Sequence, residues 1–431
     1  MYTINFTLKQ HTPIIHFQHE QDGATLRATE VKPKLDRFII EKLTGIKGKS
    51  AFDKFKENPE WKKWLVGNGE HPALNYKMKI QEKNNDETLF LPLALEQNNP
   101  EKKIAIATSL SININNIIAP TLYFANEDKI KFNQNAIDRT RSKLNEVALA
   151  KQSNSGISLE IITLSKEISG EIEKHIVSFF LQTNFGTRQN KGFGSFTISK
   201  MNGVAQEINT RMFPPGTFKK SINGNANTRI NTIFKIIKEE YQLLKSGINH
   251  GVYNKSKLFE YFVNLPNPIR WEKRKIKQEF NSNKAAKFYG IDLTKRNEPI
   301  DIVDATGSDY NSFTDKQTNN YQYIRALLGL AEQIEFQVGN PVDRGNKMVA
   351  KIDGSAVGLE RFQSPITFKV INNDIYLIPN NSFVAIYGKT VTITLKLKNG
   401  GTPHSFNIDI PSSFDIDAFL INSLNSTWTK I

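Results

Sequence analysis

The feature that most constrains the fold is a glycine-rich stretch at residues 184–196, NFGTRQNKGFGSF. It follows an apolar helical pattern at 170–185 and precedes an alternating, strand-like pattern at 195–201. The glycine motif of dinucleotide-binding proteins instead follows a strand and opens a helix, so we reject a Rossmann fold. A turn of this kind lets the backbone approach a partner closely, because glycine has no Cβ atom. A tight turn without a ligand is the alternative.

The chain before this stretch alternates between strand and helix patterns. Helices are predicted at 30–45, where Gly45 ends the pattern, at about 134–150 and at 170–185; strands are predicted at 2–8, 14–17, 104–112, 121–125, 156–164 and 195–201. Strand, helix, strands, helix, strand is the order of a ferredoxin-like, RRM-like βαββαβ unit, in which two helices cover one face of a sheet. The polar, tryptophan-bearing stretch 46–88 is interpreted as an insertion.

The remainder of the chain predicts a second, divergent unit of the same kind. Residues 202–270 form a looser segment with loop signals at 214–216 and 221–229. Helices are predicted at 231–245, 319–333 and 415–428, and strands within 364–397, at 364–371, 374–378, 382–388 and 390–397. The predicted fold class is α+β, with two fused ferredoxin-like units and insertions. The predicted domains are 1–201, which carries the glycine-rich loop and the insertion at about 46–88, and 202–431, a connector followed by the second unit.

The net charge of the chain is concentrated in two segments. Its 431 residues include 57 basic and 43 acidic side chains, a net charge of +14. Residues 183–229 contain seven basic residues and one acidic residue, and residues 266–296 contain nine and three, so each segment has a net charge of +6. This clustering indicates a surface for a polyanion, bound through neutralised phosphates and released counterions. A merely solvated basic surface is the alternative.

Composition excludes several other classes of protein. The chain has no cysteine, which excludes disulfides, thiolate zinc sites and cysteine nucleophiles. It has no apolar run long enough to span a membrane and no signal-peptide pattern at its start, so we expect a cytoplasmic protein without a membrane partner. No HExxH, Walker A or GxSxG motif occurs, and we expect no metal and no cofactor.

Three stretches resemble the RAMP superfamily of CRISPR-associated proteins. The glycine-rich loop, G-T-R-x-N-K-G-F-G-S-F, stands after the second helix and before the last strand of a ferredoxin-like unit, as in that superfamily. The N-terminal stretch 12–39, TPIIHF…GATLRATEVKPKLDRFI, resembles the RAMP opening. YIRALLGLAE (323–332) and ERFQSPITFKV (360–370) resemble the C-terminal region of the first Cmr subunit of type III-B effector complexes.

The resemblance implies an RNA-binding and non-catalytic subunit of a Cmr-like ribonucleoprotein complex in antiviral defence. Its partners would be the 3′ region of CRISPR RNA, target RNA and other subunits of the complex. The residues expected to line the RNA path are Arg27, Lys32, Lys34, Gly186, Arg188, Asn190, Lys191, Gly192, Phe193 and Gly194. In this interpretation backbone amides of the loop hold phosphate, Arg188 and Lys191 add charge, and Phe193 or Phe196 stacks on a base. Arg361 either contributes to the path or pairs with an acid.

Two alternatives remain open. The first is a metal-independent endoribonuclease that processes CRISPR RNA, with His11 or His19 as general acid or base. His16 fits an apolar core better, and Asp22, beside Gly23, fits either target cleavage or a plain turn. The second is an assembly scaffold whose basic face meets acidic subunits. Trp61 and Trp64 fit a buried helical stripe better than a base-stacking pair.

Overall fold

A computed structural model defines the fold. It describes residues 1–15, 26–67, 73–82, 86–92, 130–131, 146–153, 156–223, 229–250, 252–273, 320–330, 333–337, 347–359, 364–380, 384–397 and 400–431, with isolated residues between these ranges. The chain divides into two compact units. Unit 1 contains 1–238, 367–378 and 428–431, and unit 2 contains 239–366 and 379–427.

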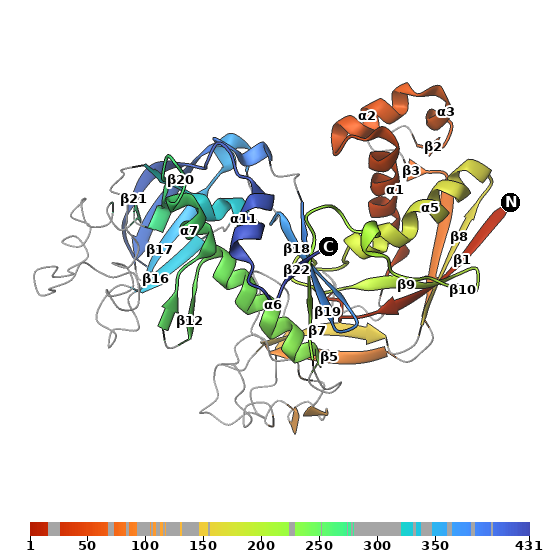
Figure 1. The fold of residues 1–431 in the computed structure, drawn as a ribbon, viewed down its shortest axis with the longest axis horizontal. Coiled ribbons are helices and arrows are strands. Elements are labelled where there is room, and N and C mark those ends of the chain that lie inside the picture. The colour runs from red at the N-terminus through yellow and green to blue at the C-terminus, as the bar shows by residue number, and fades with distance from the viewer. Residues whose placement is uncertain are drawn as a thin grey trace, which may run out of the picture. The chain divides into compact units, whose positions relative to one another are not determined.

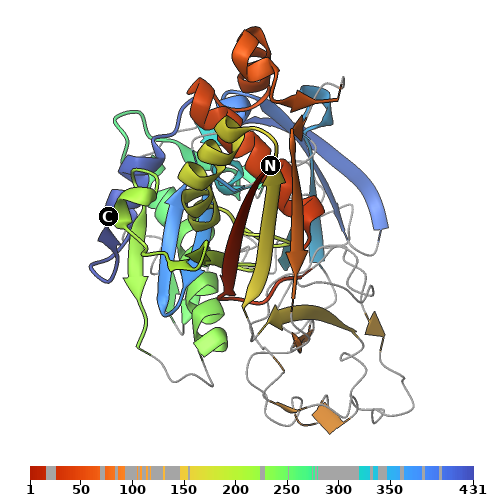
Figure 2. The ribbon, with the colours of Figure 1, turned by 90° about the vertical axis from the view of Figure 1, so that its right-hand side faces the viewer.

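The first sheet of unit 1 has the topology of a ferredoxin-like fold. Its strands are β1 (Tyr2–Gln10), β4 (Tyr76–Gln81), β8 (Ile157–Thr163), β9 (Phe196–Met201) and the short β10 (Val204–Ala205). They lie in the order β10-β9-β1-β8-β4, and every pair is antiparallel. Figure 2 shows β1, β8 and β4 side by side, in red, yellow and orange. With α1 (Ala28–Thr44) after β1 and α5 (Lys166–Gln182) after β8, the chain order is βαββαβ.

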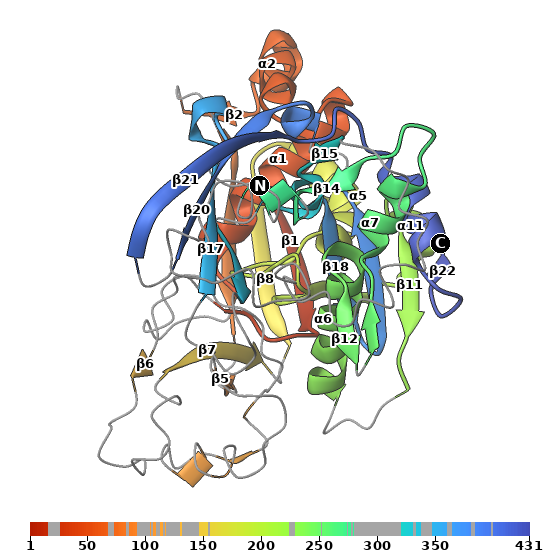
Figure 3. The ribbon, with the colours of Figure 1, turned by 90° about the vertical axis from the view of Figure 1, so that its left-hand side faces the viewer.

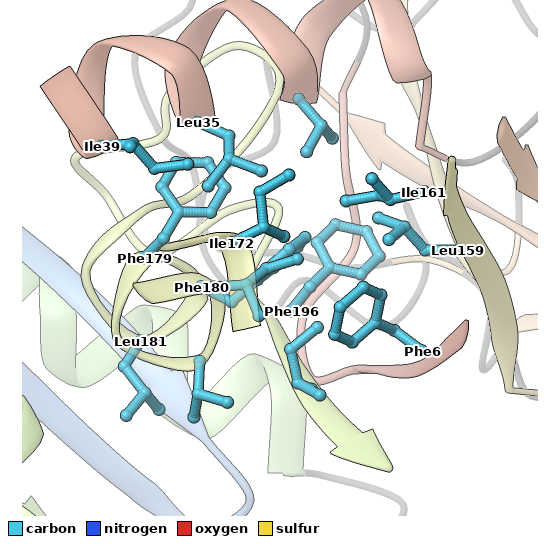
Figure 4. Packing of buried hydrophobic residues seen from close by; sticks show 14 of the residues in the cluster. Phe6, Leu35, Ile39, Leu159, Ile161, Ile172, Phe179, Phe180, Leu181 and Phe196 are labelled. Carbon is cyan, nitrogen blue, oxygen red and sulfur yellow. The ribbon is translucent and has the colours of Figure 1, made fainter. Parts of the chain in front are cut away.

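The two helices bury one face of this sheet. Helix α1 ends at Gly45, whose left-handed backbone (φ 68°) lets its amide donate to the Glu41 carbonyl. Helix α5 begins at Ser165, whose Oγ accepts the Ile168 amide. Figure 4 shows apolar side chains of the helices facing those of the strands, among them Leu35, Ile39, Ile172, Phe179, Phe180, Phe6, Leu159 and Ile161. This core fixes which face of each strand is buried.

A second sheet repeats the same strand order. It consists of β11 (Phe218–Ser221), β18 (Ile366–Ile371), β19 (Asp374–Pro379) and β22 (Thr429–Lys430), in the order β18-β19-β11-β22. Along the chain these strands alternate with α6 (Arg229–Lys245) and α11 (Ile416–Ser423) as β11, α6, β18, β19, α11, β22. This is again βαββαβ with the first strand between the third and the fourth. The predicted fold class, two fused ferredoxin-like units with insertions, is confirmed.

The long stretches between these elements form the rest of the structure. Unit 2 has an antiparallel sheet of four strands, in the order β16 (Gln333–Gln337), β17 (Lys347–Asp353), β20 (Thr390–Leu397) and β21 (Gly400–Asp409). Figure 3 shows β17, β20 and β21 side by side. It also contains α7 (Lys257–Val263), the hairpin β12 (Ile248–His250) with β13 (Val252–Asn254), the pair β14 (Arg270–Trp271) and β15 (Tyr321–Gln322), and the 3₁₀ helices η6 (Ile324–Leu328), η7 (Ser355–Val357) and η8 (Val384–Ile386).

Unit 1 carries insertions of its own, visible in Figure 1. They comprise α2 (Lys49–Glu57), α3 (Pro59–Lys62), β2 (Leu65–Val66), β3 (Ala73–Leu74), the sheet of β5 (Asp86–Pro92), β6 (Ile130–Lys131) and β7 (Glu146–Ser153), and the 3₁₀ helix η4 (Thr210–Met212). Among the described residues, no helix is both long and apolar enough to cross a bilayer.

Several element predictions are wrong. The predicted insertion 46–88 contains β4, a strand of the first sheet. Residues 146–150, predicted helical, lie in β7, and residues 104, 107 and 108, predicted as strand, are helical. The predicted helix 319–333 is only the short η6, flanked by strands, and the predicted strand 382–388 contains η8. The predicted boundary between residues 201 and 202 stays a prediction.

Candidate nucleic-acid interface

The glycine loop, residues 184–195, is held against the chain that continues β1. The His11 amide donates to the Ser195 carbonyl at 2.8 Å, the Gly194 amide to Pro13 at 2.8 Å and the Thr187 amide to Ile15 at 2.7 Å. The Thr12 hydroxyl donates to the Gly192 carbonyl at 2.6 Å. These bonds attach the loop to residues 11–15 and fix its position at one end of the first sheet.

The three glycines of the loop are required by packing. Gly186, Gly192 and Gly194 have φ values of 78°, 85° and 63°, a region that favours glycine. A Cβ atom on Gly186 would lie 2.5 Å from the Ile15 carbonyl oxygen, and one on Gly194 would overlap the Phe185 carbonyl. Close approach of the loop to its own fold therefore explains these glycines without a ligand.

The amides of the loop largely bond within the protein. Gly186 donates to Glu30 Oε1 at 2.5 Å, Lys191 to the Arg188 carbonyl at 2.8 Å and Gly192 to the Gln189 carbonyl at 3.4 Å. The amides of residues 187 and 194 donate to the backbone that follows β1. Each of these five amides already has an acceptor within the protein, so they are poor phosphate ligands, and phosphate binding by the other amides of the loop stays a prediction.

Phe193 of the loop and Phe196, the first residue of β9, are core residues. Phe193 and Phe196 are both 0% exposed. Phe196 packs edge-on against Phe185, with ring centroids 6.0 Å apart, in the core beneath α5. The predicted stacking of Phe193 or Phe196 on a base is wrong, because neither ring reaches the surface.

The tip of the loop, residues 188–191, is its partly exposed portion. Arg188 has a left-handed backbone (φ 54°), which reverses the chain direction. Asn190 accepts the Phe368 amide at 3.1 Å through its carbonyl and the Thr367 hydroxyl at 3.3 Å through its side chain. The tip is thereby anchored to β18 and presents one guanidinium and one ammonium group, those of Arg188 and Lys191.

The start of α1 lies beside this loop. Lys34 Nζ donates to the Gln189 side chain at 3.0 Å and to the Asn184 carbonyl at 3.2 Å, and it pairs with Glu30 at 3.2 Å. Burial lowers the pKa of Lys34, and the Glu30 carboxylate opposes that shift. Arg27 is the partly exposed N-cap residue of the helix. The structure therefore brings Arg27 and Lys34 to the same end of the fold as the loop.

Lys32, predicted to line the same path, has other contacts. Its Nζ pairs with Asp36 at 2.8 Å, donates to the Leu74 carbonyl at 2.9 Å and lies 3.9 Å from the centroid of the Tyr76 ring. These contacts tie α1 to β3 and β4. They account for Lys32 as a structural residue, and its RNA contact stays a prediction.

His11 is a buried linker, not an accessible acid or base. It is 3% exposed; its Nδ1 accepts the Asn372 amide at 3.1 Å, and its Nε2 lies 2.8 Å from the Thr197 hydroxyl. Burial, together with the positive charges of Lys369, Lys9 and Arg229, lowers the pKa of His11 to about 3. A general acid or base near neutral pH needs a pKa near neutrality, so burial and the lowered pKa both weigh against catalysis by His11, which stays a prediction.

Other candidates fall elsewhere. His16, His19, Asp22 and Arg361 lie outside the described residues, so their roles stay predictions. Trp61 and Trp64 are half-buried and pack on Phe55, with ring centroids 5.4 and 6.2 Å apart, which fits packing against the core. Trp64 lies beyond the end of α3, so the two do not form a stripe on one helix. No group of three metal-ligating side chains occurs within the part of the chain that the structure describes.

Lys369 is a structural residue that the sequence did not reveal. It is 0% exposed, and its Nζ donates to the carbonyls of Thr183 and Phe196 at 2.8 and 2.9 Å. It thereby joins β18 to both ends of the glycine loop. A lysine within an alternating strand pattern normally points to solvent, so the sequence carries no signal for this burial.

Comparison with known proteins decides the family. Residues 1–248 match the family model described as the Cmr1 N-terminal domain, and residues 253–430 match the model described as the Cmr1 C-terminal domain. The chain belongs to the Cmr1 family. It is therefore a CRISPR-associated RAMP protein and a subunit of a type III-B Cmr effector complex, which confirms the resemblance.

Two further comparisons complete the description of this Cmr1-family chain. A solved structure, the apo form of Cmr1 from Pyrococcus furiosus, matches with a TM-score of 0.30 and 12% identity, over 56% of this chain and 73% of that one. No curated protein sequence gives a significant match.

Proposed function

We propose that this Cmr1-family subunit binds RNA, the 3′ region of CRISPR RNA or the target RNA, at the loop tip and the start of α1. It would act as a non-catalytic member of a cytoplasmic complex in antiviral defence. The observation that carries the proposal is the contact of Lys34 with Gln189 at 3.0 Å, which places the α1 start beside Arg188 and Lys191. Basic side chains from two distant parts of the sequence thus gather at one end of the fold.

The mode of binding follows from what the loop has available. Its aromatic rings are buried, and the amides of residues 185–187, 191, 192, 194 and 195 are bonded internally. Arg188, Gln189, Asn190 and Lys191 would therefore make the contacts with their side chains. Such groups recognise phosphate and ribose and carry little sequence information. That suits a guide-dependent complex, in which base pairing with the guide supplies sequence specificity.

The test replaces both cations of the tip without disturbing the backbone. Arg188→Asn retains a residue type that tolerates the left-handed conformation, and Lys191→Gln keeps a long side chain. In the double variant we expect weaker binding of single-stranded RNA and a salt-dependence slope lower by about 1.4, at about 0.7 for each phosphate that is no longer neutralised. Fluorescence anisotropy over a series of salt concentrations measures both.

A matched control removes two exposed lysines of α5, as Lys166→Gln with Lys174→Gln, and should leave the slope unchanged apart from a small nonspecific effect. Equal affinity and slope for the loop variant and the unmodified protein would contradict the proposal. Loss of assembly into the complex, with no RNA crosslinks at the glycine loop of the unmodified protein, would favour the scaffold alternative. Specific cleavage of repeat-containing RNA in EDTA, abolished by His19→Ala, would favour the nuclease.

A further inference from the structure

The first sheet has a second face that the helices do not cover. Along β1, the buried side chains of Ile4, Phe6 and Leu8 alternate with exposed Asn5 and Lys9. The same alternation holds along β8 and β4. Successive side chains of a strand point to opposite faces. The residues that alternate with the core residues therefore form an open face, on the side away from α1 and α5.

Exposed lysines gather on this open face. Lys77 and Lys79 of β4, Lys9 of β1 and Lys200 of β9 are all exposed. The strand register places Lys79 in one row with Glu160 and Asn5, and Lys200 directly opposite Thr7. On the described strands, this face carries four lysines and one acidic residue, Glu160, and is therefore positively charged.

Among the described residues, several lysines on the helical side are ion-paired, whereas three on the open face are not. On the helices, Lys32 pairs with Asp36, Lys34 with Glu30 and Lys174 with Glu171. Within the described parts of the chain, Lys77, Lys79 and Lys200 have no ion-pair partner. A row of lysines without carboxylate partners is the arrangement expected where the anion comes from another molecule.

The side chains between the lysines select the kind of anion. Most are hydroxyl and amide groups, those of Thr3, Asn5, Thr7 and Ser158, which can bond phosphate oxygens and ribose hydroxyls; Ile162, opposite Lys77, is apolar. The described strands place no aromatic ring on this face. Protein interfaces are rich in aromatic residues and arginine and poor in lysine and serine, so an acidic protein is the weaker candidate.

We propose that the open face of the first sheet is a second RNA-contact surface, on which Lys77, Lys79 and Lys200 bind phosphates of an RNA backbone. It rests on the proposed RNA-binding function and extends it to a site away from the glycine loop. Because no ring is available for stacking on the described strands, the RNA would be held by its backbone and without preference for sequence.

The open face continues toward other positive groups of unit 1. Lys9 Nζ donates to the Asn372 side chain at 3.0 Å, and the Arg229 guanidinium donates to the Asn372 carbonyl. Asn372 lies in the turn between β18 and β19. Lys9 therefore connects the lysines of the sheet to the start of α6. The proposed surface extends from β4 across β1 to the second sheet.

The test uses the full chain and a fluorescently labelled single-stranded RNA. The triple variant Lys77→Gln, Lys79→Gln, Lys200→Gln should lower the slope of log affinity against log salt by about 2, at about 0.7 for each phosphate that is no longer bound. The matched control, Lys62→Gln, Lys166→Gln, Lys174→Gln, removes the same charge from exposed positions on helical elements. It should lower the slope much less. Circular dichroism confirms that both variants fold.

The outcomes separate this inference from the proposed function. An unchanged slope in the triple variant, together with a lower slope in the loop-tip variant, would overturn the open-face site and leave the loop site standing. A salt-dependence slope that is lower in the triple variant and unchanged in the loop-tip variant would support the open-face site and contradict RNA binding at the loop tip. An equal fall in the triple variant and its control would reduce the effect to net charge and overturn the site. The site would also be overturned if the triple variant bound RNA unchanged but no longer bound a neighbouring subunit.

Discussion

Phe193 of the glycine loop stacks on Phe234 of α6, with ring centroids 4.1 Å apart and planes inclined by 17°. Both rings are 0% exposed. Phe193 lies within the motif that most resembles an RNA-binding signature. Its ring nevertheless joins the loop to α6, a helix of the second βαββαβ repeat. This contact makes the loop a structural junction as well as a candidate binding surface.

The first prediction concerns this stacked pair. Phe193→Ala removes a buried ring and should lower the free energy of unfolding by about 3–5 kcal/mol, the usual cost of a phenylalanine-sized cavity. Phe193→Leu should cost less, because it keeps most of the volume. Urea unfolding followed by circular dichroism measures both. Full stability combined with abolished RNA binding in Phe193→Ala would show instead that the ring contacts a base.

The second prediction compares two glycines with positive φ. Gly194→Ala should prevent stable folding, because the new Cβ atom would overlap the Phe185 carbonyl, and backbone cannot move aside cheaply. Gly203→Ala has a similar φ, 82°, but nothing lies within 4 Å of its added Cβ. It should cost only the left-handed strain of about 1–2 kcal/mol. Equal thermal stabilities of the two variants would contradict the packing explanation.

Sequence patterns predicted the elements whose period and end signals agree. The helix ending at Gly45 and the strand 195–201 both combine a clear period with a cap or a turn. The helix predicted at 170–185 exists, but it is α5, which starts four residues earlier, after Ser165, and ends at Gln182. Strand β4 was missed because its alternating lysines and apolar residues lie inside a polar stretch that resembles an insertion. Its place at the edge of the sheet depends on pairing with β8, which is about 80 residues away in sequence.

The sequence predicted where the candidate site lies, but not which of its groups are buried or already hydrogen-bonded. The sequence located the loop and the basic residues at its tip. It could not show that Phe193 is buried or that the Gly186 amide donates to Glu30, because both depend on contacts between residues far apart in the chain. The same holds for Lys369, which a local pattern would place at the surface.

The third prediction is a pH dependence caused by His11. Its pKa is about 3 in the folded chain against an ordinary value of 6.5, so between these pH values the unfolded chain binds a proton that the folded chain does not. Stability should therefore fall as the pH decreases through this window, by up to about 1.4 kcal/mol per pH unit. Urea unfolding across the window should give a shallower pH dependence for His11→Gln. Identical slopes would mean that His11 is protonated in the folded protein.

The fourth prediction concerns Lys369. Burial lowers its pKa well below the ordinary 10.5, so the unfolded chain holds its proton to higher pH than the folded chain does. Stability should rise as the pH increases from the folded pKa toward 10.5. Lys369→Met lacks this titration and cannot make the bonds to Thr183 and Phe196, so its deficit relative to the unmodified protein should grow with pH. A constant deficit across alkaline pH would contradict a buried, shifted lysine.

The last prediction separates positioning from contact at the candidate interface. Lys34 pairs with Glu30 and bonds Gln189, so its charge is balanced locally while its Nζ holds the loop. Lys34→Met should lower stability by about 1 kcal/mol and weaken RNA binding, with little change in the salt slope. Lys191→Met should leave stability nearly unchanged and lower the slope by about 0.7, since it would leave one phosphate without its cation. Measuring unfolding and salt-dependent binding on both variants distinguishes the roles. The reverse pattern, with the slope lowered in Lys34→Met and kept in Lys191→Met, would move the phosphate contact from the loop tip to the start of α1.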